Sequence, residues 1–210
     1  LSTMPHIVRQ AFQYVMAPLS SAQAHRDRAQ VAHIYTFAAR VSAALVVPLA
    51  GLLIFAGKDV LSVYRPEAMA ALPLLAILTA ARAAEAVVGP AASIVEMTGH
   101  RALPLINSLV AVGLWAALAA LLVPDLGALG MAIAAASATV AAAAAAAIEL
   151  RLSDGMNPID GRLLRGLAVS ALVYAAMAAV FLTLPGLVRF ITLHLVWAAG
   201  TWATLKAGLG

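Results

Sequence analysis

The sequence predicts an all-α protein, a polytopic transmembrane helix bundle. Apolar residues make up 64% of the 210 residues and charged residues only 10%, against about 45–50% and 25% in a soluble domain. Apolar stretches of about 20 residues, the length that crosses the hydrocarbon core of a bilayer as a helix, recur along the chain. Short connections separate these stretches, so we expect neighbouring helices to run antiparallel.

The elements follow in order from the apolar stretches. The chain opens with a shorter segment, Leu1–Ser20, which we interpret as one partial helix. Six predicted spanning helices follow at Tyr35–Ala56, Glu67–Val95, Ala102–Val123, Leu126–Leu150, Gly166–Leu184 and Leu187–Lys206. The connections leave no room for a soluble domain, so residues 1–210 are predicted to form a single transmembrane lobe. Since the first residue is Leu1 and no signal-peptide pattern opens the chain, we expect a fragment of a longer protein.

Some residues inside these helices are expected to serve packing. Small residues recur every four positions in the fourth span and predict a packing seam: Gly130, Ala134, Ala138, Ala142 and Ala146. Small residues let helix backbones approach closely in lipid, and polar side chains form hydrogen bonds between helices. We therefore expect interhelical hydrogen bonds from Asn107 and Ser108, and a packing role for His194.

The basic residues predict the orientation, because Lys and Arg are retained on the cytoplasmic side. One set of alternate connections holds seven: Arg26, Arg28, Arg101, Arg151, Arg162, Arg165 and Lys206. The other set holds three: Lys58, Arg65 and Arg189. The C-terminus is accordingly predicted to be cytoplasmic, in a multi-pass protein of the membrane. The net charge of +4 is spread over helix ends, so membrane lipids are the expected partner and nucleic acid is not.

A polar stripe marks the first segment. His6, Arg9, Gln10 and Gln13 are spaced by three and four residues, so they share one face of a helix. Such a stripe lines a cavity within a bundle, and the alternative is a helix lying in the headgroup region with its polar face in water. The cavity interpretation makes these four residues candidate substrate-binding residues.

Three further charges lie inside predicted spans. Arg82 and Glu85 are one helical turn apart, and charges at membrane depth mark either a compensating pair or a polar pathway. Arg40 lies near the beginning of its predicted span, where a long side chain can reach the interface. A phosphate contact is the alternative for Arg40, which makes it a further candidate substrate-binding residue.

Several chemistries find no support in the sequence. The chain has no cysteine and no HExxH, GxSxG or Walker motif. His25 and Asp27 are the only close histidine–carboxylate neighbours, and no third ligand accompanies them. We therefore predict no enzyme activity, no metal and no cofactor.

Three motifs in order resemble a known family. They are Gly89-Pro90, then Glu96-Met97-Thr98-Gly99-His100, then the block from Val123 to Ala134, which Ser137 follows. This order resembles the C-terminal half of polysaccharide-biosynthesis flippases (Wzx-like), in the multidrug/oligosaccharidyl-lipid/polysaccharide exporter superfamily. The stretch Met16–Leu19, followed by a charged loop and Arg40, also resembles the inter-helix region of that family. The resemblance covers residues 16–150; Trp115 and Ala119 stand where the family often has asparagine.

The resemblance implies the C-terminal lobe of a MATE/MurJ-like two-lobe transporter, with the N-terminal lobe upstream of this chain. It implies that the two lobes alternately open a basic central cavity to each side of a bacterial cytoplasmic (inner) membrane. The implied substrate is an undecaprenyl-diphosphate-linked oligosaccharide. Arginines suit a diphosphate, and the polysaccharide synthesis machinery is an expected partner. The alternatives are a cation-coupled drug or metabolite antiporter using Glu85, a membrane-embedded enzyme acting on lipid-linked sugars, and a polysaccharide assembly partner without transport activity.

Overall fold

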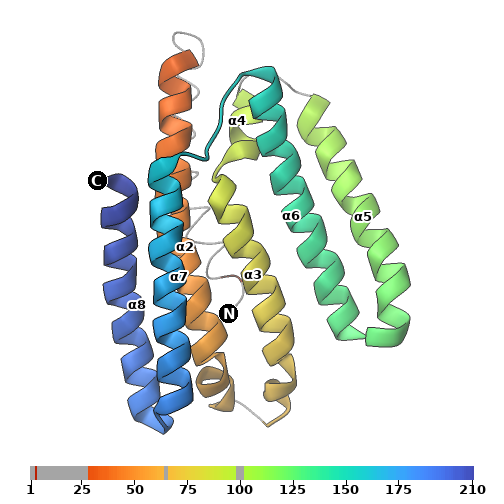
Figure 1. Ribbon diagram of the computed structural model, residues 1–210. Helices are drawn as coiled ribbons and strands as arrows, with labels where there is room; N and C mark the ends of the chain where they lie inside the picture. Colours follow the sequence, from red (N-terminus) through yellow and green to blue (C-terminus); the bar gives the residue numbers. More distant parts are fainter. Residues whose placement is uncertain (1–2, 4–27, 64–65, 98–101) are drawn as a thin grey trace.

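A computed structural model describes Thr3 and residues 28–63, 66–97 and 102–210 (Figure 1). This part of the chain is helical and holds no strand, so the predicted all-α class is confirmed. Its elements are α2 (Arg28–Ser62), a 3-10 helix (Pro66–Ala71), α3 (Leu72–Val88), α4 (Ala91–Met97), α5 (Ala102–Leu126), α6 (Ala128–Ser153), α7 (Gly161–Thr183) and α8 (Gly186–Leu209).

Five helical segments of the described part are long and apolar enough to cross a membrane: Ala29–Ser62, Glu67–Val88, Ala102–Leu126, Ala128–Ser153 and Gly161–Thr183. They indicate a membrane protein. The sixth predicted span forms α8, a helix of 24 residues, but it is not one of the five. Arg189, His194 and Lys206 interrupt the apolar sequence of α8.

The predicted helix Glu67–Val95 is wrong as a single element. Its residues form the 3-10 helix, α3 and α4. The break lies at Gly89-Pro90, because proline supplies no N–H to the preceding turn and Gly89 has a positive φ of 64°. A Cβ at Gly89 would lie 2.8 Å from Ala39 Cα, so glycine also permits the close approach of α2.

Other helices extend beyond their predicted ends. α2 begins at Arg28 and continues to Ser62, and α5 continues through Pro124 to Leu126. The predicted spans leave residues 151–165 between them, yet α6 continues to Ser153 and α7 begins at Gly161. Asp160 explains the early start of α7, because its carboxylate accepts a hydrogen bond from Leu163 N at 2.9 Å as an N-cap.

The helices form a row of packed neighbours (Figure 1). α2, α7 and α8 pack against one another, α3 packs against α2 and α6, and α6 packs against α5 and the short α4. One apolar cluster joins α2 to α7 and α8 around Met177 and Leu193. A second joins α2, α4 and α6 around Tyr35 and Leu150.

The predicted small-residue seam is confirmed for four of its five residues, whereas Ala142 is only half-buried. Gly130, Ala134, Ala138 and Ala146 are buried, and α6 contacts both α3 and α5. At Gly130 a Cβ would lie 2.4 Å from Leu122 O, so α5 and α6 meet there without room for a side chain.

Two ion pairs join α2 to its neighbours. Arg40 Nε donates to Asp160 Oδ1 at 3.2 Å and Arg40 Nη2 pairs with Oδ2. Towards the other end of α2, Arg189 Nε donates to Asp59 Oδ2 at 3.0 Å and Nη2 pairs with Oδ1. Both are two-pronged arginine–carboxylate contacts, the geometry that holds two groups most firmly in register.

Candidate functional site

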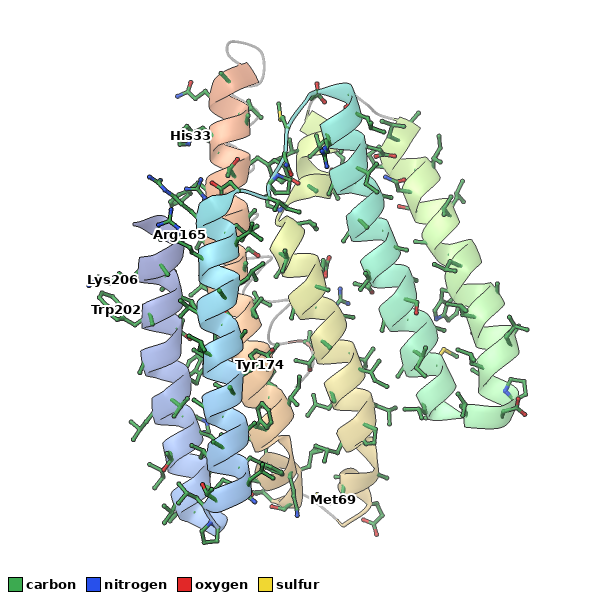
Figure 2. All side chains as sticks on the ribbon, in the orientation of Figure 1. His33, Met69, Arg165, Tyr174, Trp202 and Lys206 are labelled. Carbon is green, nitrogen blue, oxygen red and sulfur yellow. The ribbon has the colours of Figure 1, made fainter. Side chains whose placement is uncertain are left out.

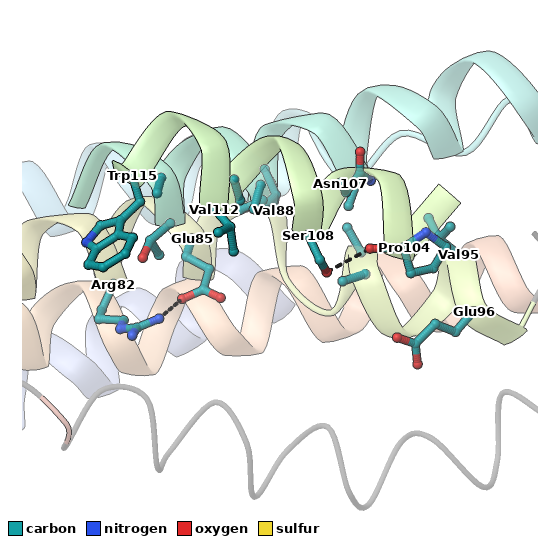
Figure 3. Close-up of a pocket in the computed structure, with 18 of the residues that line it drawn as sticks. Arg82, Glu85, Val88, Val95, Glu96, Pro104, Asn107, Ser108, Val112 and Trp115 are labelled. Carbon is teal, nitrogen blue, oxygen red and sulfur yellow. Dashed lines mark hydrogen bonds and ion pairs between the residues drawn. The ribbon is translucent and has the colours of Figure 1, made fainter. Parts of the chain in front are cut away.

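A cavity of about 470 Å³ lies between α3, α4, α5 and α6 (Figure 3). Its polar lining comes from Arg82, Glu85, Glu96, Asn107, Ser108 and Thr139. The α6 side is lined largely by alanines, and these short side chains leave open the space that the cavity occupies.

Arg82 and Glu85 contribute an ion pair to this lining. Arg82 Nη1 donates to Glu85 Oε2 at 2.9 Å, so the predicted pairing is confirmed. The Arg82 side chain is 33% exposed and that of Glu85 is 14% exposed. Both residues line the cavity, so the ion pair borders it.

The other polar groups spread along the cavity. Trp115 lies beside Arg82 in Figure 3, whereas Glu96 lies towards the opposite end, past Ser108. The Trp115 side chain is 40% exposed. The cavity therefore presents an aromatic face together with separated carboxylates, an amide and a hydroxyl.

Asn107 stabilises the wall between α5 and α6. Its Nδ2 donates to Glu149 Oε2 at 2.7 Å, which confirms the interhelical hydrogen bond expected of Asn107. Ser108 differs from the prediction, because its hydroxyl donates to Pro104 O within α5 at 2.8 Å. His194 packs in α8 as predicted, with its ring centroid 4.3 Å from that of Phe190.

The structure brings only some predicted site residues together. Arg82 and Glu85 line the cavity, but Arg40 does not, and its side chain binds Asp160. Arg40 also lies about three turns into α2, deeper than the sequence predicted. The polar stripe His6, Arg9, Gln10 and Gln13 lies outside the described residues.

The pKa of Asp160 shows how closely Arg40 is held. Partial burial of the Asp160 carboxyl raises its pKa, but the hydrogen bonds from Leu163 N and Arg40 and the positive charges of Arg40 and Arg162 outweigh that effect. The net result is a pKa below the usual 3.8. The carboxylate therefore stays charged at neutral pH and keeps Arg40 engaged.

Glu96 and Trp115 were not predicted as cavity residues. Glu96 follows Glu85 by three helical turns, a spacing that would have placed both on one face of a continuous helix. The break at Gly89-Pro90 separates them onto α3 and α4, and the cavity still includes both. The described lining thus carries one arginine and two glutamates, less basic than the resemblance implies.

Neither metal-ligand clusters among the described residues nor comparisons with known proteins assign a function. Among the described residues, no three histidine, aspartate or glutamate side chains come together as a metal site. No family model and no curated protein matches the chain.

Proposed function

We propose that the protein is a transporter lobe that moves an undecaprenyl-diphosphate-linked oligosaccharide across a bacterial cytoplasmic membrane by alternating access. The observation that carries the proposal is a cavity with several polar lining residues, three of whose lining helices are long enough to span a bilayer. A soluble, hydrophilic group crossing a membrane needs such a polar space, because hydrocarbon offers it no hydrogen bonds.

The chemistry of the cavity supports the sugar part of this substrate. Sugars present hydroxyl donors and acceptors around apolar ring faces. Glu96, Asn107 and Ser108 offer carboxylate, amide and hydroxyl partners, and Trp115 offers a flat apolar face. The resemblance of residues 16–150 to polysaccharide flippases points in the same direction.

The diphosphate requires cations. Arg82 is the cation of the described cavity lining, and its guanidinium can donate to a phosphate oxygen while still contacting Glu85. We propose Arg9, with His6, Gln10 and Gln13, as the further anion-binding residues, because their spacing of three and four residues predicts one helical face.

The test is export in cells that depend on the complete protein. Trp115→Ala and Glu96→Gln should each lower surface polysaccharide and cause lipid-linked oligosaccharide to accumulate on the cytoplasmic face, with the protein level unchanged. Glu67→Gln is the matched control, because Glu67 is exposed on the 3-10 helix and does not line the cavity. Normal export by both cavity variants would contradict the proposal.

One observation favours a second function, a cation-coupled antiporter. Glu85 and Glu96 outnumber Arg82 in the described lining, and carboxylates can carry a proton or bind sodium. Reconstituted vesicles distinguish the two functions: an antiporter would dissipate an imposed proton or sodium gradient when drug is added, and a flippase would instead expose labelled lipid-linked sugar.

A further inference from the structure

The outer face of α8 is an exposed apolar stripe that ends in a cation. Val188, Leu195 and Trp202 follow one another at seven-residue spacing and are 57%, 65% and 72% exposed. Residues spaced this way share one face of a helix. Lys206 lies one turn beyond Trp202 on that face and is exposed, so the stripe passes from apolar to aromatic to basic.

Two arginines of α7 lie at the same level. A Cβ at Gly166 would lie 3.7 Å from both Gly208 Cα and Thr204 O, which places this turn of α7 beside the turn that carries Lys206. Arg165 adjoins Gly166, and Arg162 lies one turn earlier; both are exposed. Figure 2 shows Arg165, Lys206 and Trp202 near the same end of the bundle.

The carboxylate at the start of α7, which acts on Arg162 as well as on Arg40, cancels only part of the charge of this cluster. Asp160 is held by Arg40 of α2 through two contacts. Arg162, Arg165 and Lys206 therefore leave an excess of positive charge at the end of an apolar face.

We propose that Trp202, Lys206, Arg165 and Arg162 form a binding site for the headgroup of an anionic phospholipid. The apolar stripe accommodates its acyl chains, Trp202 lies at the boundary where aromatic rings concentrate, and the three cations bind its phosphate. Long basic side chains reach the headgroup level while their stems stay on apolar surface. This site lies on α7 and α8 and is independent of the cavity and of the transport proposal.

The test uses the fluorescence of Trp202 in the reconstituted protein. Two vesicle preparations have the same ratio of phosphatidylcholine to phosphatidylglycerol, and bromine, which quenches tryptophan, is on the chains of one lipid or of the other. We expect stronger quenching when phosphatidylglycerol carries the bromine. Trp202→Phe, which leaves Trp115 and Trp197, should abolish the difference.

The variant Arg165→Gln/Lys206→Gln should weaken the preference for phosphatidylglycerol by about fivefold for each cation removed. The reason is that a basic residue near an anionic surface contributes about 1 kcal/mol. Lys58→Gln is the matched control, because Lys58 is exposed at the far end of α2. High salt should weaken the preference of the unchanged protein by screening, a readout that needs no variant. Equal quenching by both lipids in the unchanged protein, or an undiminished preference in the double variant, would overturn the site.

Discussion

The hydroxyl of Thr204 on α8 donates a hydrogen bond to the carbonyl oxygen of Ala44 on α2 at 3.0 Å. Pro48, four residues after Ala44, lacks the N–H that would otherwise donate to this oxygen. The same hydroxyl lies 2.9 Å from Thr201 O, so its proton is shared between the two helices. Tyr174 of α7 also donates to α2 nearby, at Val47 O, with a distance of 3.0 Å.

Thr204→Val should destabilise the protein, because it leaves Ala44 O without a donor in a buried position. Interhelical hydrogen bonds in membranes contribute about 0.6 kcal/mol on average and up to about 1.7 kcal/mol, and we expect a loss of about 1 kcal/mol. Unfolding in mixed detergent would measure it. In a Pro48→Ala background the restored N–H serves Ala44 O, so the same substitution should cost less.

The matched control for this prediction is Thr192→Val. Thr192 also lies on α8, but its hydroxyl is exposed and bonds Val188 O of its own helix. It should change stability little. A Thr204→Val cost that is the same with and without Pro48 would contradict the link between the two residues.

The Arg40–Asp160 pair predicts a pH dependence at the acid end. Folding lowers the pKa of Asp160 below 3.8, so the unfolded chain takes up the proton first as the pH falls. The stabilisation that the Arg40–Asp160 pair gives to the fold is complete above pH 3.8. It disappears as the pH falls through the lower pKa that Asp160 has in the folded protein. Asp160→Asn should be less stable at neutral pH, and the difference from the unchanged protein should shrink below pH 3.8 in acid unfolding.

Arg82 and Glu85 should behave as a coupled pair. Glu85→Ala leaves the Arg82 guanidinium beside the cavity without its partner and should cost about 1–2 kcal/mol in a site this accessible. Adding Arg82→Ala should recover much of the loss if the pair is structural. A double variant that folds normally but does not transport would assign the pair to the substrate or ion pathway; single variants that behave like the unchanged protein would refute the coupling.

The loop charges predict the sidedness of the protein. The chain has no cysteine, so single substitutions report cleanly. Ser153→Cys, near the predicted cytoplasmic end, should resist an impermeant thiol reagent in intact cells, whereas Val63→Cys should react. The reverse pattern would place the C-terminus outside the cytoplasm.

The helices could be predicted from the sequence because apolar length alone defines a membrane-spanning helix. Their ends could not, because capping and ion pairs decide them. The first turn of α7 is polar, with Arg162 and Arg165, yet it is helical because Asp160 caps it. Gly89-Pro90 is one of the family-like motifs. Because it lies inside a long apolar stretch, the sequence pattern did not predict the break between α3 and α4.

The candidate site was only partly predictable for a similar reason. Arg82 and Glu85 could be paired from their spacing, since one helical turn brings such side chains together. Trp115 and Glu96 could not be joined to them, because that depends on how α4 and α5 pack across the alanine face of α6. For Arg40 the sequence predicts a phosphate contact or a position at the membrane interface. It does not reveal the true partner, Asp160, because that residue lies 120 residues away in sequence.

We expect the two arginine–aspartate pairs of α2 to set a preferred membrane thickness. Arg40 and Asp59 are 19 residues apart within α2, a rise of about 28 Å at 1.5 Å per residue. That distance is close to the roughly 30 Å hydrocarbon depth of an ordinary bilayer, and each pair ties α2 to a second helix at its own level. In a much thicker bilayer α2 cannot slide past α7 and α8 without breaking a pair, so the lipid, rather than the bundle, has to thin around it.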